Sequence, residues 1–408
     1  MQHILLTNAK IYTADDSLGT IENGYVLIDS TSGKIESVGS VDNLISSLEN
    51  VLINRNTLKE INLKNKYVYP GFIDAHTHLG ICESFLTFEG DDTNEITDPV
   101  TPQLRAIDAV NPLDAAFKEA LCSGVTSVAI SPGSANPIGG EIFLAKTYGK
   151  ILDEMIVKQP VGIKFALGEN PKSAYSERDE TPVTRMATVA LIRESLYKAK
   201  KYYKDLQRSF TDEDYSMPDY DIKSESLIPL LKREIKAYFH AHRTDDICTA
   251  IRIAKEFNLD YAIVHCTQGH LIKEYLSKEK VNVLLGPILG DACKPELSNA
   301  SARSSVILSE SENINLCVVS DHPETPVQYL LLSCKVAVEK GLNEWDALKS
   351  ITINPAKLFG IEKKSGSISI GKDANINIFS SNPFTTMCLN PETVICEGHI
   401  VQSLGNVD

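Results

Sequence analysis

The sequence has no apolar run that approaches the roughly 18 residues needed for a membrane span. Its first ten residues lack a basic start followed by a sustained apolar core, so neither export nor membrane insertion is expected. Nine cysteines are scattered along the chain without a C-x-x-C pair. Scattered, odd-numbered cysteines are typical of reduced thiols, and they predict a cytoplasmic protein.

Acidic residues outnumber basic ones: the sequence has 54 Asp and Glu residues and 40 Lys and Arg residues, so its net charge is -14. An acidic protein repels nucleic acids and anionic membranes, so the expected partner is a small-molecule substrate. With 408 residues, 43% of them hydrophobic, the chain is long enough for a large α/β domain and a smaller one. The oligomeric state is open, and a homo-oligomer is compatible with the sequence.

Both ends of the chain have short alternating runs separated by Gly, Asn and Asp, a pattern that indicates antiparallel β-structure. Neither end has enough strands for a stable sheet, so we expect the two ends to pair. The predicted organisation is a composite β-sandwich domain of residues 1–66 and 357–408. A barrel domain of residues 67–356 is then a single insertion between them.

In the middle of the chain, strand-like runs alternate with amphipathic segments of helical length, which is the pattern of parallel β/α units. Eight strands fit a (β/α)8 TIM barrel, and we expect them at residues 67–75, 125–131, 141–146, 162–167, 236–242, 261–265, 281–285 and 315–320. Helices are expected at residues 113–122, 186–206, 245–256, 327–339 and 344–351. The acidic segment 209–226 lacks periodicity and predicts a loop, either a lid or a solvated surface excursion.

An apolar strand ending in two histidines is predicted by the segment Y-P-G-F-I-D-A-H-T-H-L-G at residues 69–80. His76 and His78 are two residues apart, so they point to one face of the strand and could bind one cation. Other predicted strands also end in residues that are costly to bury: His240, His242, His265 and Asp321. Active sites of parallel barrels lie at these strand ends, so the set indicates a metal site rather than unrelated buried histidines.

The same segment, followed by strand-end His240, His265 and Asp321, resembles the amidohydrolase superfamily. The similarity extends over nearly the whole chain, including the passage N-P-A-K-L-F-G-I-E…G-S-I-S-I-G-K-D-A-N-I-N-I-F at residues 354–379. Within the superfamily it is most similar to the imidazolonepropionase-related metal-dependent hydrolases. The resemblance implies an enzyme with one or two divalent ions, zinc first, with iron or manganese as alternatives.

The resemblance also implies roles for individual residues. Asp321 would be the last metal contact and the general base, and the other ligands would be His76, His78, His240 and His265. His242 lies one layer further out on its strand, so we expect it to contact substrate or stabilise an oxyanion. Weaker substrate-binding candidates are His270, His322 and Arg243, and Arg243 could equally pair with Asp245 or Asp246.

Many relatives bridge two metals with a carboxylated lysine or a glutamate from the fourth strand, and others hold one ion. Here the two candidates are Lys164 and Glu169. Alternation places Lys164 opposite three bulky side chains that belong against outer helices, namely Ile163, Phe165 and Leu167. We therefore prefer Lys164, whose carbamate has two oxygens for two ions, although Glu169 could reach the site if Gly168 bends the chain. The plainer alternatives are a salt bridge for Lys164 and a helix cap for Glu169.

These observations predict a metal-dependent hydrolase of carbon–nitrogen bonds in a non-peptide amide, a cyclic amide or a dipeptide. Metal-activated water would attack the carbonyl, and Asp321 would act as general acid and base. A heterocycle deaminase would use the same machinery and differ only in substrate. An alternative from another class is a non-catalytic amidohydrolase-like scaffold.

Overall fold

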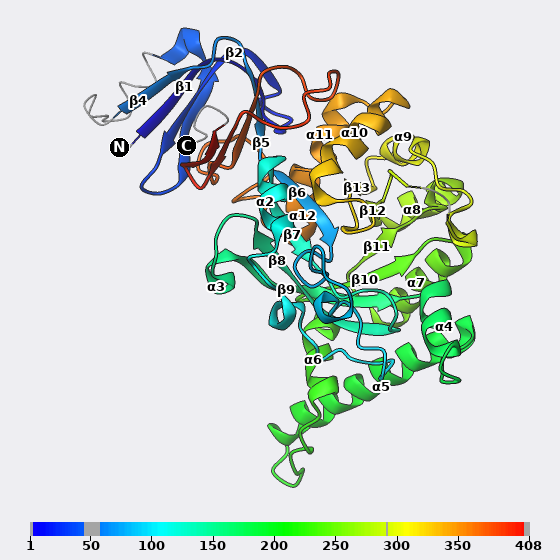
Figure 1. Cartoon of the computed structure of the whole chain (residues 1–408). Coiled ribbons are helices and arrows are strands. Elements are labelled where there is room, and N and C mark those ends of the chain that lie inside the picture. The colour runs from blue at the N-terminus through cyan, green and yellow to red at the C-terminus, as the bar shows by residue number, and fades with distance from the viewer. Residues whose placement is uncertain (1–2, 45–57, 291–292, 404–408) are drawn as a thin grey trace.

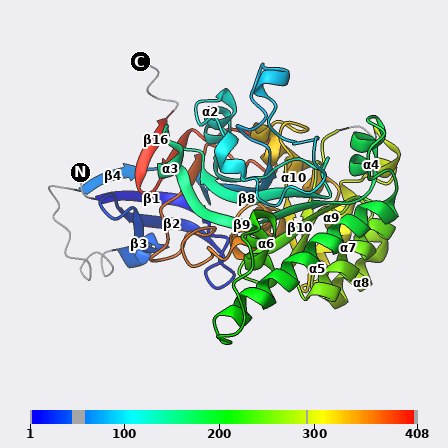
Figure 2. The same cartoon turned by 90° about the horizontal axis from the view of Figure 1, so that it is seen from below.

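The computed structural model describes residues 3–44, 58–290 and 293–403. Parts of the predicted terminal segments, at residues 1–2, 45–57 and 404–408, lie outside the described residues. Two eight-stranded sheets organise the described chain, one at each end of the molecule (Figures 1 and 2). Helices surround the second sheet, whereas the first is built almost entirely of strands.

The first sheet has the strand order β16-β15-β14-β5-β1-β2-β3, with β4 paired to β1. Its strands are β1 His3–Tyr12, β2 Thr20–Asp29, β3 Lys34–Ser40, β4 Leu58–Asn62, β5 Tyr67–Pro70, β14 Ile376–Phe379, β15 Thr393–Cys396 and β16 His399–Ser403. Strand β5 pairs with β1 on one side and β14 on the other, so the N-terminal (blue) and C-terminal (red) strands share one sheet in Figure 1. This sharing was predicted. The further prediction, a separate β-sandwich domain of residues 1–66 and 357–408, remains a prediction.

The strand expected at residues 67–75 is two strands in the structure. β5 ends at Pro70 and belongs to the first sheet, whereas β6, Phe72–Thr77, belongs to the second. Gly71 lies between them, and a Cβ there would be 2.3 Å from Thr126 Oγ1. The chain therefore passes from one sheet to the other at a point where only glycine fits without a shift.

The second sheet has the strand order β13-β12-β11-β10-β9-β8-β7-β6. After β6, its strands are β7 Val125–Ile130, β8 Ile138–Lys146, β9 Ile156–Ala166, β10 Lys236–Ala241, β11 Tyr261–His265, β12 Asn282–Leu285 and β13 Asn315–Val318. The expectation of parallel strands throughout was wrong for β8, which is antiparallel to both β7 and β9. Only the short segment 131–137 separates β7 from β8, and a parallel crossover needs about a dozen residues or more.

The first and last strands of the second sheet meet, so the sheet is a nearly closed barrel. Thr77 and His322 form a parallel bridge just beyond the two strands. Asp321 N donates to His76 O at 3.1 Å, and His78 N donates to His322 O at 2.8 Å. These bonds place the ends of β6 and β13 side by side, which brings together two of the residues predicted to bind metal.

In the described chain, the helices that cover the barrel include five near the positions expected from periodicity and six that were not predicted. They are α2 Ala115–Cys122, α3 Leu152–Met155, α4 Glu169–Ser176, α5 Arg185–Ser209, α6 Ile222–Leu231, α7 Thr244–Phe257, α8 Lys273–Glu279, α9 Arg303–Ser309, α10 Leu330–Glu339, α11 Glu344–Ser350 and α12 Ile353–Phe359. Short 3-10 helices occupy Val41–Asn43, Phe88–Gly90, Ala106–Ala109, Gly269–Ile272, Pro295–Leu297 and Val327–Tyr329. In the described part of the chain, no helix has both the length and the apolar character required to traverse a bilayer.

The outward face of β9 carries the apolar side chains expected there. Ile163, Phe165 and Leu167 belong to one buried cluster with Ile192 and Leu196 of α5. The alternation that predicted an outward face for these three residues is therefore confirmed. Lys164, between them in sequence, is left facing the barrel interior, and it is completely buried.

The loop expected at residues 209–226 is shorter than predicted, because α6 begins at Ile222 and is helical through the last five of those positions. The remaining residues join α5 to α6 at the lower end of the molecule in Figure 1, where the long α5 extends past the barrel. The loop is not among the segments that line the cavity at the carboxyl ends of the strands. It does not cover them as a lid.

Candidate metal centre

The end of β6 and the loop after β13 form the first cluster of potential metal ligands. His76 Nε2 and His78 Nε2 lie 3.3 Å and 3.5 Å from Asp321 Oδ1. All three side chains are buried or nearly so. Asp321 has a φ of 58°, which is a left-handed conformation. Its side chain therefore does not follow the alternating directions of the side chains in the preceding strand. One ligand atom from each residue lies within 4.8 Å of the others.

The ends of β10 and β11 form the second cluster, His240, His242 and His265. The ring centroids of His240 and His242 are 4.7 Å apart, and each lies 4.5 Å from the centroid of His265. The two clusters adjoin, because His265 Nδ1 is 3.9 Å from Asp321 Oδ2. The five residues predicted to bind metal through imidazole or carboxylate are thus brought together, with His242 beside them.

Backbone carbonyls orient two of the imidazole rings. His78 Nδ1 donates to Ser131 O, and His265 Nδ1 donates to Gly286 O, both at 2.7 Å. Because a carbonyl can only accept, each ring keeps its proton on Nδ1 and presents an unprotonated Nε2 when it is neutral. His242 Nδ1 is held similarly, 2.7 Å from Thr267 Oγ1.

Burial keeps four of the clustered histidines neutral: His76, His240, His242 and His265. It is the largest influence on His76, whose pKa is lowered to about 3, with a further contribution from the nearby Lys164. The pKa of His242 is also lowered to about 3, by burial and then by Lys294. For His240 and His265, burial and the neighbouring histidines lower the pKa well below the ordinary value. Neutral imidazoles are the form that binds a metal ion.

Burial opposes ionisation of Asp321, but the neighbouring His265 and the close contacts with His76 and His78 outweigh it. They hold the pKa of the Asp321 carboxyl well below its usual value. The carboxylate is therefore ionised at neutral pH, beside unprotonated ring nitrogens. This combination supplies both a negative ligand and a proton acceptor.

The ring nitrogens of His240, unpaired within the described part of the chain, indicate that the residues of the two clusters fit a divalent cation. Both ring nitrogens of His240 are buried and have no hydrogen-bond partner among the described residues. Leaving such groups unsatisfied costs about 1–3 kcal/mol each, so a native site is expected to satisfy them. A metal ion at the junction of the two clusters would do so, and imidazole with carboxylate is the ligand set that zinc and similar ions take.

Lys164 lies inside the barrel beside the first cluster. Its Nζ is 3.1 Å from His76 Nε2, and the residue is fully buried. Burial lowers the pKa of Lys164 to about 8, although the negative charge of Asp321 opposes this shift. The plainer alternative for Lys164 was a salt bridge inside the barrel. Among the described residues, its side chain instead contacts an imidazole.

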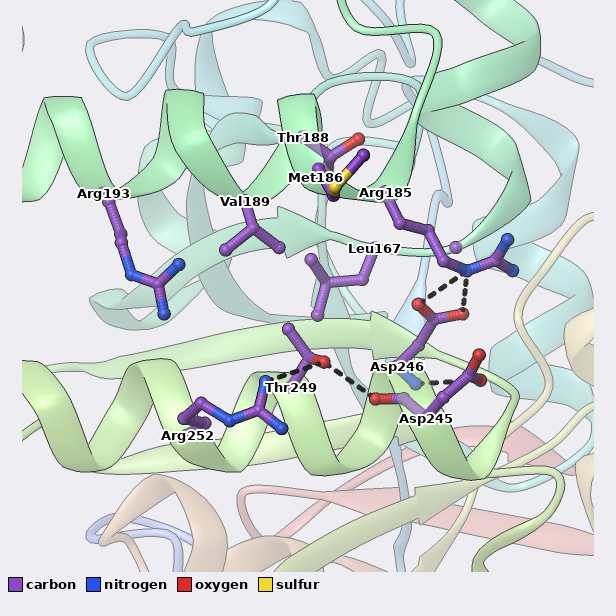
Figure 3. A pocket seen from close by; sticks show the side chains of 11 residues that line it. Leu167, Arg185, Met186, Thr188, Val189, Arg193, Asp245, Asp246, Thr249 and Arg252 are labelled. Atoms are coloured by element: carbon purple, nitrogen blue, oxygen red, sulfur yellow. Dashed lines mark hydrogen bonds and ion pairs between the residues drawn. The ribbon is translucent and has the colours of Figure 1, made fainter.

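Glu169, the other bridging candidate, begins α4 and is not among the residues that line the cavity over the clusters. Its backbone N–H donates to Glu296 Oε1 at 2.6 Å. Glu296 is tied in turn to Arg185, which also pairs with Asp246. Figure 3 shows Arg185 and Asp246 in a separate cavity between α5 and α7. This network fixes the start of α4, where Asn170 but not Glu169 lines the cavity over the clusters.

The three substrate-binding candidates do not line the cavity over the clusters. Arg243 is exposed and pairs with Asp245 through Nη2 and Oδ2 at 2.8 Å, which is the plainer alternative considered for it. His270 Nδ1 lies 3.1 Å from Thr267 O and 2.9 Å from Ser304 Oγ. His322 is buried, and its Nδ1 accepts from Val327 N at 3.2 Å. These contacts explain the three residues without a substrate.

A cavity of about 460 Å³ opens over both clusters. Besides four of the histidines and Asp321, it is lined by residues that sequence reasoning did not single out, among them Cys82, Asp91, Asn94, Asn170, Lys294 and Glu324. No residue of the segment 209–226 is among them. These residues lie in loops that follow barrel strands or, for Asn170, in the first turn of α4 after β9, and that position was the one signal available for them in the sequence.

Comparison with known proteins agrees with this architecture. The family model described as "Amidohydrolase family" matches residues 67–401. The crystal structure of an amidohydrolase from Thermotoga maritima MSB8 is 38% identical and superposes with a TM-score of 0.90, covering 98% of this chain and 100% of that one.

Two curated proteins are also similar. Amidohydrolase tasK of Hapsidospora irregularis is 29% identical over 77% of this chain and 34% of its own length. A 5-methylthioadenosine/S-adenosylhomocysteine deaminase of Halothermothrix orenii (strain H 168 / OCM 544 / DSM 9562) is 35% identical over 18% of this chain and 16% of its own length. The chain thus spans about a third or less of the curated relatives that it matches.

The chain belongs to the amidohydrolase family. The resemblance noted at residues 69–80 and at the strand ends is thereby confirmed. The chain has the barrel of this family and clusters of His and Asp that fit the divalent metals its members bind. The alternative of a non-catalytic scaffold is not supported.

Proposed function

We propose that the enzyme hydrolyses a carbon–nitrogen bond in an amide, a cyclic amide or a dipeptide, with one or two divalent ions in the site described above. The observation that carries this proposal is the convergence of His76, His78, His240, His265 and Asp321 under one cavity. Zinc is the first candidate, because imidazole and carboxylate suit it, and iron and manganese are alternatives. When bound, the ion supplies Lewis acidity, which polarises a carbonyl and lowers the pKa of water.

Asp321 is proposed as the residue that moves the proton. Its carboxylate, 8% exposed, reaches the cavity and contacts both histidines of β6. It would accept a proton from the attacking water and deliver it to the leaving nitrogen, so the carboxylate returns to its starting state. His242, on the cavity wall beside His240, is proposed to face the carbonyl oxygen as negative charge develops there.

Lys164 is proposed as the bridging residue if the site holds two ions. Its buried amine can lose a proton more readily than an exposed one and add to carbon dioxide, forming an N–C bond and releasing a proton. The resulting carbamate would be an anion with two oxygens in the barrel interior. Glu169 has no contact that favours it for this role, since its own backbone is held by Glu296.

A second candidate function is deamination of a heterocycle. The partial match to a protein named as a 5-methylthioadenosine/S-adenosylhomocysteine deaminase favours keeping it, although the match covers only 18% of this chain. The same strand-end residues would serve, because attack of water on a C=N carbon also needs a Lewis acid and a proton shuttle. The relationship to imidazolonepropionase-related enzymes, a cytoplasmic location, small molecules as the only partners and a homo-oligomeric state also remain proposals.

The test combines metal analysis with a substrate library. Protein expressed with zinc, iron or manganese is analysed for bound metal and assayed with dipeptides, N-acyl amino acids, cyclic amides and amino-heterocycles. We expect at least one ion per chain, turnover of a member of the first three groups, loss of turnover with a chelator and its return when metal is restored. Turnover confined to amino-heterocycles would favour the deaminase. Protein that is expressed with these metals but purified without bound metal would contradict both candidate functions.

A further inference from the structure

Lys294 is the only lysine or arginine among the described residues that line the cavity over the metal clusters. It is partly buried, in the loop after β12. The other charged side chains on the wall are the acidic residues Asp91, Asp321 and Glu324. Among the described side chains of the wall, Lys294 is therefore the one that favours a negative group of the substrate.

The ammonium of Lys294 is held by a neutral partner. Its Nζ donates to Asn170 Oδ1 at 2.8 Å, and Asn170 Nδ2 donates to Ser134 Oγ at 2.7 Å. Among the residues that the structure describes, no carboxylate oxygen lies within 4.0 Å of the ammonium. An ammonium has three N–H groups, so two remain after the bond to Asn170. The positive charge is thus positioned but not neutralised.

The position of this pair relative to the metal clusters follows from the strand order. Asn170 follows β9 and Lys294 follows β12, so the two side chains meet beyond the ends of β10 and β11, which lie between those strands. These are the strands that end in the histidines of the second cluster. The influence of Lys294 on the pKa of His242 is consistent with this proximity.

The acidic part of the wall lies on the other side. Asp91 follows β6 and Glu324 follows β13, the strands that meet where the barrel closes over the first cluster. Both residues are exposed. A substrate that spans the two clusters would therefore have one end near an ammonium and the other near two carboxylates.

We propose that Lys294, positioned by Asn170, binds a carboxylate of the substrate and determines specificity for substrates with a free acid on the β10–β12 side of the scissile bond. The inference rests on the proposed hydrolysis of a carbon–nitrogen bond. Unblocked dipeptides and N-acyl amino acids have such a carboxylate, whereas their amides do not. The amine of a dipeptide lies toward Asp91 and Glu324, since opposite charges attract across the cavity.

A binding experiment tests the proposal without turnover. Purified protein is titrated by calorimetry with ketone isosteres of N-acetyl amino acids, in which a methylene group replaces the scissile nitrogen so that they cannot be cleaved there, and with the corresponding primary amides of these acids. We expect wild type to bind the acids at least about 10-fold more tightly, the ratio expected for a hydrogen bond to a charged group. Lys294→Met removes this preference, Lys294→Arg keeps a large part of it, and the exposed control Lys340→Met leaves it unchanged. Equal binding of acids and amides to wild type, or an unchanged preference in Lys294→Met, would overturn the assignment.

Kinetics separate this inference from the proposed function. Wild type is expected to cleave dipeptides faster than their C-terminal amides, and Lys294→Met should raise KM for the free acids with a smaller change in kcat. If acids and amides are cleaved equally well by both proteins, the carboxylate site is wrong and hydrolysis stands. If the Lys294-dependent binding preference is found but no carbon–nitrogen bond is cleaved, the proposed function is wrong and the carboxylate site stands.

Discussion

Lys164 Nζ lies 3.1 Å from His76 Nε2 in the barrel interior, although each of the two groups is a cation when protonated. Burial lowers the pKa of His76 to about 3 and that of Lys164 to about 8, so the imidazole is neutral at physiological pH and the amine deprotonates easily. The contact is therefore one between a metal-binding ring and an amine suited to carbamate formation.

Replacing Lys164 distinguishes the two candidates for a bridging ligand. We expect Lys164→Met to lose bound metal and to lower kcat/KM by at least about 100-fold, the upper end of the effect seen when groups that support a metal site are removed. Glu169→Gln, the matched change on the same segment, should retain both. Elemental analysis and steady-state kinetics measure the two properties. Metal loss in Glu169→Gln with normal content in Lys164→Met would reverse the assignment.

The carboxylate of Asp321 is expected to matter more for turnover than for folding. Asp321→Asn keeps an oxygen of the same shape but cannot accept a proton, so kcat should fall by about 10²–10⁴-fold, the range typical of general acid–base catalysis. The melting temperature and metal content should stay close to wild type. Asp214→Asn, an exposed change in the loop between α5 and α6, serves as the control. Full activity in Asp321→Asn would contradict the proton-transfer role.

Metal-depleted protein is expected to lose stability in mild acid because of its buried histidines. Burial lowers the pKa of His242 to about 3 and that of His322 to about 4. Below pH ~6.5 the unfolded chain binds protons at these positions while the folded chain does not, so stability is full above that pH and falls as pH drops toward the folded values. At pH ~5.5 each residue costs about 1.4 kcal/mol.

Urea unfolding of chelated protein at about pH 7.5 and about pH 5.5 measures this loss. His322→Gln should reduce the difference in unfolding free energy between the two pH values by about 1.4 kcal/mol, since it removes one of the groups. His399→Gln, an exposed position on β16, should leave the difference as in wild type. An unfolding free energy that does not change between the two pH values would show that these histidines are protonated equally in both states.

Gly286 links the backbone to a metal ligand. Its carbonyl accepts from His265 Nδ1 at 2.7 Å, and a Cβ at this position would lie 2.1 Å from Val319 O. Gly286→Ala should therefore shift the backbone, destabilise the protein by about 1–3 kcal/mol and weaken metal binding about 10–100-fold. Chemical denaturation and metal titration measure the two effects. Gly39→Ala is the control, because its Cβ would only reach ordinary contact, 3.4 Å from Tyr25. Unchanged metal affinity in a destabilised Gly286→Ala protein would show that this carbonyl does not position His265.

The sequence by itself determined the features that depend on neighbouring residues. The strand-end positions of His76, His78, His240 and His265 could be recognised because periodicity of two and apolar runs are local. The inward direction of Lys164 followed for the same reason, from the bulky residues on either side of it. The pairing of the two chain ends could also be predicted, since neither end has enough strands for a sheet alone.

Only the tertiary structure decided what depends on contacts between distant segments. Closure of the barrel places Asp321 against His76. The backbone N–H of Glu169 bonds to Glu296 at the start of α4, and Lys294 meets Asn170 on the wall of the cavity. In each case the partner lies more than a hundred residues away in sequence or on another strand's loop, and local periodicity contains no information about such contacts. The proposed metal ligands were therefore readable in the sequence, whereas the wall of the cavity, which we propose to select the substrate, was not.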